Sequence, residues 1–315
     1  MKKKIVYIVH VVDTEGPLFE SLKSTFKRIE EIFGLKLKPT KNNLIKLQAE
    51  KLKIYNKKKI KRLLNPLKII TSNNWRKIDK MLSEITSTKY RLNTKDSFGN
   101  GWFYNWFCLN HVGFKGTNPR KRVLGYHKVY DHYNNNKFLT KYEKNNGSLQ
   151  FHYHAPSLTS DAHRAGSTFL NSSNLFDCLS RFVIDRNWFP SVFRAGHNCE
   201  RLDLNFFLEQ WIPFDFSNNN YEKNQSSEDL NSRFDDWRNA SKSWLPYHPD
   251  HRNYQRKGNC HRLIARCVPI NERSHTITYS EITKAFQEAQ KKGNAILSFF
   301  HHDFRDMRPD LEYVK

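Results

Sequence analysis

Four short polar clusters in this 315-residue sequence carry side chains that can do chemistry. The first is Asp13-Thr14-Glu15, which directly follows an apolar run at residues 5–12. Two carboxylates at that point can hold a metal ion or act as a general base. Asp13 or Thr14 could instead cap a helix that begins near Pro17.

The second cluster contains His152 and His154, separated by one residue in a predicted strand at 150–156. Side chains at positions i and i+2 of a strand point to the same face, so the two imidazoles can bind one metal ion. The alternative is a chance pair, since the chain has 14 histidines.

The third cluster, FRAGHN, and the fourth, HHD, also lie at predicted strand ends. Arg194 can orient a catalytic carboxylate or form a structural ion pair. His301 or His302 can act as a general acid, because the unperturbed histidine pKa lies near neutrality, and the adjacent Asp303 could raise that pKa. Together the four clusters indicate metal-assisted hydrolysis.

The elements that position these clusters alternate between strand and helix. The run at 5–12 is typical of a strand covered on both faces. Apolar spacings of three and four predict a helix at 18–33 that ends at Gly34. Further predicted elements are a helix at 168–187, a strand at 191–195, a helix from Ser280 to Gly293 and a strand at 295–300. This order predicts an α/β fold with a parallel sheet, whose functional sites gather at the carboxyl ends of the strands.

The formal charge of the chain is +22, and more than half of it lies in one segment. Residues 21–70 contain 15 lysines and arginines against 3 acids, interleaved with apolar residues at helical spacing. We expect a basic helical insertion at 19–70 with a solvated outer face, and its alternative role is contact with phosphate or an anionic membrane. No base-reading motif accompanies it, so no nucleic-acid partner is expected.

Two features place the chain in a reducing compartment. The five cysteines form no CxxC pair, which argues against a disulfide framework. The apolar run after the first lysines is too short for a signal peptide, and no stretch approaches the roughly 20 apolar residues of a membrane span. We therefore expect a cytoplasmic protein without a transmembrane segment.

Two further segments are singled out by composition. The segment 99–114 is densely aromatic, and Trp102, Tyr104 and Trp106 could either stack on sugar rings or form a core strand. The segment 217–260 is polar and is predicted to be a loop-rich insertion. Its Tyr247-His248-Pro249-Asp250-His251 constellation is expected to be an ordinary loop, and the alternative is that it contributes a ligand or a substrate contact.

The ordered set VDTEG, FHYHAPS, FRAGHN, PFDFSN and ILSFFHHD resembles the polysaccharide deacetylases of the NodB-like group, carbohydrate esterase family 4. It is most similar to the members found with surface-polysaccharide and lipopolysaccharide genes. The resemblance implies a single catalytic domain over residues 1–315, folded as a deformed (β/α) barrel of about seven strands. It also implies one divalent metal ion, with zinc as the first choice.

The resemblance also suggests a role for each site residue. Asp13 would be the base and Glu15 a metal ligand, although the two roles could be exchanged. Arg194 would orient the base. His302 would be the general acid, with His301 in reserve, and Asp215 would contact the substrate.

The second motif departs from the pattern of this group. The family places its two ligand histidines four residues apart, whereas His152 and His154 are two apart. The resemblance implies Glu15, His152 and His154 as the ligand set, and this departure leaves Ser157 or His163 as alternative partners of His152.

The implied activity is removal of an acetyl group, first of all N-acetyl, from a sugar in surface-polysaccharide biosynthesis. The substrate would be an acetylated sugar or a nucleotide- or lipid-linked sugar. Two alternatives stay open. One is a related metal-dependent hydrolase of another non-peptide C–N bond, and the other is a non-catalytic binding protein with a basic docking surface.

Overall fold

The computed structural model covers the whole chain and describes the larger part of it. The described residues are 4–17, 22–55, 57, 60–61, 72–110, 127–139, 147–154, 174–196, 200, 202–220, 237, 239–270 and 279–311.

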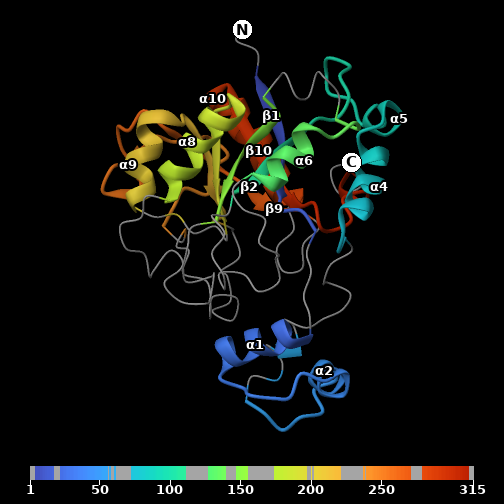
Figure 1. Ribbon diagram of the computed structural model, residues 1–315. Helices are drawn as coiled ribbons and strands as arrows, with labels where there is room; N and C mark the ends of the chain where they lie inside the picture. Colours follow the sequence, from blue (N-terminus) through green and yellow to red (C-terminus); the bar gives the residue numbers. More distant parts are fainter. Residues whose placement is uncertain are drawn as a thin grey trace.

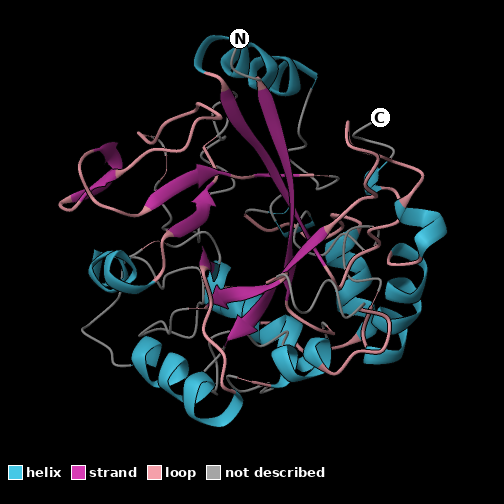
Figure 2. Cartoon of the chain, turned by 90° about the horizontal axis from the view of Figure 1, so that it is seen from above, coloured by secondary structure: helices cyan, strands magenta, loops and turns pink. Residues whose placement is uncertain are grey.

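Eight parallel strands form one sheet that nearly closes into a barrel (Figure 2). In sheet order they are β8 (Leu263–Arg266), β5 (Phe214–Asn218), β4 (Val192–Ala195), β3 (Leu149–Tyr153), β2 (Tyr104–Asn110), β1 (Ile5–Thr14), β10 (Asn294–His302) and β9 (Val268–Pro269). Only Cys267 separates β8 from β9, so one stretch of chain pairs with β5 and then with β10. The predicted (β/α) barrel is confirmed, with eight strands rather than about seven because this stretch is interrupted.

Helices pack around the outside of this barrel (Figure 2). They are α4 (Trp75–Ile85), α5 (Thr88–Arg91), α6 (Lys128–Asn134), α8 (Asn174–Arg186), α9 (Leu202–Trp211) and α10 (Tyr279–Lys292). The predicted helix from Ser280 to Gly293 corresponds to α10. Gly293 has a φ of 101°, a conformation that glycine adopts freely, and its N–H bonds the carbonyl of Ala289 at 2.8 Å.

The two faces of the barrel wall bury different clusters. Val11, Phe107, Phe216, Ala265, Cys267 and Phe300 come from strands around the barrel and form its inner core. A larger cluster, which includes Val12 and Phe299, fills the space between strands and helices. Because side chains alternate along a strand, Asp13 shares the inner face with Val11, and His302 shares it with Phe300.

The basic segment after β1 folds around a core of its own. Helices α1 (Leu22–Phe33) and α2 (Lys41–Gln48) bury Phe26, Ile29, Leu47 and Ile60, and the strands contribute nothing to this cluster. Gly34 ends α1 as predicted, with a φ of 66°. Figure 1 shows β1 running from the N terminus toward α1 and α2, so these helices lie beyond the carboxyl ends of the strands. Residues 18–21 and 62–71 lie outside the described residues, so the predicted bounds of 19–70 remain a prediction.

The predicted loop-rich insertion at 217–260 is described in part. Its described portion contains a small antiparallel hairpin of β6 (Pro249–Asp250) and β7 (Asn253–Lys257). Residues 221–236 lie outside the described residues. Across the described part of the chain, no helix is both long and apolar enough to cross a bilayer.

Candidate metal centre

Three buried side chains at the carboxyl ends of β1 and β3 bring their ligand atoms together. Glu15 follows β1, and His152 and His154 lie on β3 and directly after it. The Nε2 atoms of the two histidines are 3.1 Å apart. Glu15 Oε1 lies 3.2 Å from Nε2 of His154 and 3.6 Å from Nε2 of His152.

This triangle, with sides of 3.1, 3.2 and 3.6 Å, is close to the size of a tetrahedral zinc site, and two of its sides are slightly shorter. Ligand atoms about 2.0–2.2 Å from a tetrahedral zinc ion lie roughly 3.3–3.6 Å from one another. Two histidines and one glutamate are also the donor set of one class of catalytic zinc sites, which leave the fourth position for water. The residues present therefore fit a divalent metal ion, and this triad is the only candidate group among the described residues.

Main-chain contacts orient both histidines toward the triangle. Nδ1 of His152 lies 3.1 Å from the carbonyl oxygen of Arg194. A carbonyl oxygen only accepts, so Nδ1 carries the proton and Nε2 keeps its lone pair for a metal ion. His154 packs directly against Gly196, where an added Cβ would come within 2.7 Å of the imidazole Cγ. The glycine of the FRAGHN motif, Gly196, thus leaves space for the imidazole of His154, a candidate metal ligand.

Arg194 holds Asp13 beside the triad. Its Nε donates to Asp13 Oδ1 at 2.6 Å, and its Nη1 donates to the carbonyl of Phe216 at 2.5 Å. The guanidinium also lies over the Phe300 ring at 3.9 Å from the centroid, which fixes its plane. Burial raises the pKa of Asp13, but the positive charge of Arg194, with His152 and His302, outweighs burial and lowers it. Asp13 is therefore ionised at neutral pH.

His302 faces this centre from β10, the strand paired with β1, where it is the register partner of Asp13. Its Nε2 lies 3.8 Å from Asp13 Oδ2 and 4.0 Å from Glu15 Oε1. The His302 side chain is 18% exposed, whereas Asp13 and Glu15 are 4% and 8% exposed. This position, at the open side of the centre, suits a group that passes a proton to a substrate.

His301 points away from the centre, because it alternates with His302 along β10. Its Nδ1 contacts Asp310 Oδ2 at 2.8 Å on the outer side of the barrel wall. His10 Nε2 lies 3.5 Å from the same oxygen. Trp102 Nε1 donates to Nδ1 of His10 at 3.0 Å, which leaves the His10 proton on Nε2, facing the carboxylate. His301 thus belongs to a buried network outside the metal centre.

Asp303 has a role that the sequence did not reveal. It was expected to partner the preceding histidine, but its carboxylate accepts the main-chain N–H groups of Glu15 at 2.9 Å and Gly16 at 3.0 Å. The Tyr133 hydroxyl donates to the same carboxylate at 2.8 Å. Asp303 therefore fixes the turn that carries Glu15. The one available signal was the acid at the end of the last strand.

Gly16 is required at this turn for two reasons. Its φ of 70° is in the left-handed region, and a Cβ there would come within 2.6 Å of the Trp75 indole.

Asp215 makes a structural ion pair instead of the expected substrate contact. It alternates with the inward-facing Phe216, so its side chain lies on the outer face of β5. Asp215 Oδ2 accepts from Arg262 Nη1 at 2.8 Å, and Oδ1 accepts the N–H of Ser217 at 2.8 Å. Burial raises the pKa of Asp215 against the opposing effect of Arg262.

The three aromatic residues expected to stack on sugars lie in the core. Tyr104 and Trp106 are fully buried and stack on each other with centroids 5.2 Å apart. Trp102 is 8% exposed and lies on the Phe299 ring. None of the three presents an open ring face, so the core-strand alternative holds and the stacking role does not.

The remaining candidates are the two alternative ligands and the Tyr247–His251 constellation. The alternative ligands Ser157 and His163 lie outside the described residues. In the Tyr247–His251 constellation, Tyr247 donates its hydroxyl to the carbonyl of Tyr254 at 2.7 Å, and His248 Nδ1 contacts the carbonyl of Arg262. These contacts stabilise the β6–β7 hairpin, so the constellation belongs to a strand pair and not to the ordinary loop that is expected from the sequence.

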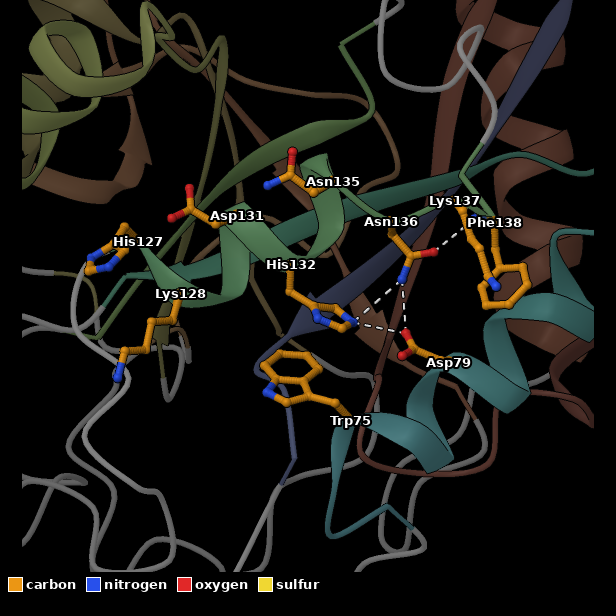
Figure 3. A pocket seen from close by; sticks show the side chains of 10 residues that line it. All are labelled: Trp75, Asp79, His127, Lys128, Asp131, His132, Asn135, Asn136, Lys137 and Phe138. Carbon is orange, nitrogen blue, oxygen red and sulfur yellow. Dashed lines mark hydrogen bonds and ion pairs between the residues drawn. The ribbon is translucent and has the colours of Figure 1, made fainter.

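A pocket of about 630 Å³ lies between α4 and α6 (Figure 3). Trp75 touches Gly16 and stacks on His132, with centroids 3.9 Å apart. Asp79 Oδ1 accepts from Asn136 Nδ2 and contacts His132 Nε2, both at 2.9 Å. No member of the metal triad lines this pocket, so it is separate from the metal centre.

Comparison of the chain with models of protein families, with curated proteins and with solved structures gives no match. The assignment of function therefore depends on the sequence motifs and on the geometry of the centre.

Proposed function

We propose that this protein is a metal-dependent hydrolase that removes an acetyl group, first of all N-acetyl, from a sugar or a sugar-containing intermediate. One observation carries the proposal. A His₂Glu triad, an arginine-held carboxylate and a third, more open histidine converge at the carboxyl end of a parallel barrel. The sugar as substrate class is supported by the motif order, which resembles the NodB-like polysaccharide deacetylases.

Each residue has one task in the proposed reaction. Glu15, His152 and His154 would hold a divalent metal ion, with zinc as the first choice, and that ion would polarise the acetyl carbonyl and activate water. Asp13, kept ionised by Arg194, takes a proton from the attacking water. His302 donates a proton to the leaving amine nitrogen. Acetate and a free amino sugar are the products.

The same centre would suit an O-acetyl ester or another non-peptide C–N bond, so the leaving group must be measured. The substrates to compare are a free N-acetylhexosamine, its nucleotide-linked form, a lipid-linked form and a cyclic amide. Acetate release from one of the first three supports the proposal. Turnover of the cyclic amide alone contradicts it.

The site assignment is tested by metal content and activity in the same preparation. We expect about one equivalent of divalent metal in the purified protein and near-complete loss of metal and acetate release in His152→Ala/His154→Ala. The matched control His251→Ala/His261→Ala removes two exposed histidines and should change neither quantity. Retained metal and activity in the first double variant would contradict the site. A metal-free, inactive wild-type protein would favour a non-catalytic binding protein.

A further inference from the structure

The basic segment after β1 is a separate unit, which we call the basic module and define as residues 22–61. Its core of Phe26, Ile29, Leu47 and Ile60 includes no residue of the barrel. Because this cluster, as far as the chain is described, contains no residue of the barrel, the outward side chains of the module are not needed to attach the strands to their helices. Their composition must be explained by something else.

The outward side chains of the basic module are mainly lysines. In the stretch from Lys51 to Tyr55, Leu52 and Ile54 pack against the module core, and Lys51 and Lys53 between them are exposed. Tyr55 completes this alternation and is 90% exposed. Lys57 is also exposed. We call Lys51, Lys53, Tyr55 and Lys57 the outer strip.

Within the described part of the chain, the lysines of the outer strip form no ion pairs. Of the three acids in the module, Glu30 pairs with Lys36 at 4.0 Å and Glu50 with Lys61 at 2.7 Å, and the side chain of Glu31 lies outside the described part. Among the described residues, Lys51, Lys53 and Lys57 have no carboxylate at ion-pair distance. Three unpaired ammonium groups beside an exposed phenol ring form a surface that attracts an anionic partner and offers an amphipathic ring to it.

We propose that the outer strip docks the protein reversibly onto an anionic phospholipid bilayer. Lysines gain about 1 kcal/mol each near an anionic membrane surface, roughly fivefold in binding. Tyrosine prefers the interface between headgroups and acyl chains, where its ring is apolar and its hydroxyl is hydrated. Ile45 on α2, 59% exposed, adds apolar surface to the same module. A single exposed ring offers little for the successive base stacking that a single-stranded nucleic acid uses, so a bilayer fits better.

The place of the module gives this docking a consequence for the metal centre. Figure 1 shows α1 and α2 beyond the carboxyl ends of the strands, the end of the barrel where the triad lies. A protein held to a bilayer by this module presents the metal centre on the membrane-facing side. The substrate class that benefits is a lipid-linked sugar. This last step rests on the proposed function, whereas the docking itself does not.

Vesicle binding of the full chain tests the docking. We expect the wild-type protein to sediment with vesicles of phosphatidylcholine and phosphatidylglycerol, and not with vesicles of phosphatidylcholine alone. Lys51→Gln/Lys53→Gln should weaken binding by about 25-fold, from roughly fivefold for each lysine. Tyr55→Ser should cause a smaller loss that persists at high salt, where screening suppresses the contribution of the lysines.

The matched control is Lys291→Gln/Lys292→Gln. These two exposed lysines end α10, near the amino end of the strands, so the variant removes the same charge from the far side of the barrel. Unchanged binding in this control supports the outer strip. An equal loss in both double variants would overturn the proposal, because net charge alone would then explain binding. Tighter binding to a single-stranded RNA oligomer, lost in Lys51→Gln/Lys53→Gln, would also overturn it.

Metal content and acetate release from a free sugar separate the two proposals. Both should be unchanged in the outer-strip variants. Vesicle binding without any deacetylation would contradict the proposed function and would still support the proposed docking.

Discussion

At the residue scale, the proposed function requires that one carboxylate of the first motif act as the base and the other as a metal ligand. Asp13 Oδ1 is bound by Arg194 at 2.6 Å, whereas Glu15 Oε1 faces the two Nε2 atoms. An arginine-bound carboxylate is already compensated in charge, while the glutamate and the neutral imidazoles form a metal donor set. The geometry thus favours Asp13 as the proposed base and Glu15 as the proposed metal ligand, two roles that the sequence left exchangeable.

This division predicts opposite behaviour of two conservative variants. Asp13→Asn should keep about one equivalent of metal and lose acetate release by a factor on the order of 10²–10⁴, the usual contribution of a general base. Glu15→Gln should lose the metal as well, because a neutral amide is a poor replacement for an anionic ligand. Metal analysis and acetate assays on both variants check this. The reverse pattern would exchange the roles of the two residues.

At the element scale, the strand ends were predictable while their cross-connections were not. Alternating or continuous apolar runs indicated β1, β3, β4 and β10, and the clusters at their ends do meet. The Asp303 carboxylate accepts hydrogen bonds from the main-chain N–H groups of Glu15 and Gly16, which lie 288 and 287 residues before it in the sequence. Such a bond leaves no periodic trace in one sequence, because any acid at a strand end has the same local pattern. The pairing of Asp215 with Arg262 escaped prediction for the same reason.

A second cross-connection joins β1, β10 and the turn that follows β10 through Asp310. Burial raises the pKa of Asp310, but its contacts with His301 and His10 outweigh burial and lower it. A carboxyl group whose pKa is lowered on folding stabilises the protein above its unfolded pKa, about 3.9, and this stabilisation is lost as the pH falls through the folded value. Asp310 should therefore stabilise the fold fully at neutral pH.

Asp310→Asn should destabilise the protein by about 2–4 kcal/mol at pH 7, since it removes a buried carboxylate from two imidazoles. The difference from wild type should stay constant down to about pH 5 and shrink below about pH 4. Urea unfolding at a series of pH values measures this. A difference that is independent of pH down to the acid transition would contradict the assignment of Asp310 as an ionised partner of both histidines.

At the scale of the whole molecule, the chain combines a barrel with a basic module that has its own core. Composition indicated the module, because its charge density differs from that of the remainder of the chain. Only the structure shows that Phe26, Ile29, Leu47 and Ile60 form a cluster apart from the barrel core. Two separate cores need not unfold together, since the cooperativity of unfolding follows shared packing.

Leu47→Ala tests this separation, because Leu47 is 1% exposed and lies in the module core. Truncation of a buried leucine costs about 2–5 kcal/mol, and in a cluster of this size that loss should open the module without opening the barrel. Hydrogen exchange should then rise across residues 22–55 and stay unchanged in β1 and β10, while metal content is retained. Leu297→Ala in β10, equally buried at 2% exposure, is the matched control and should raise exchange throughout the barrel. Loss of metal in Leu47→Ala, or equal exchange in both variants, would show that the two cores unfold as one unit.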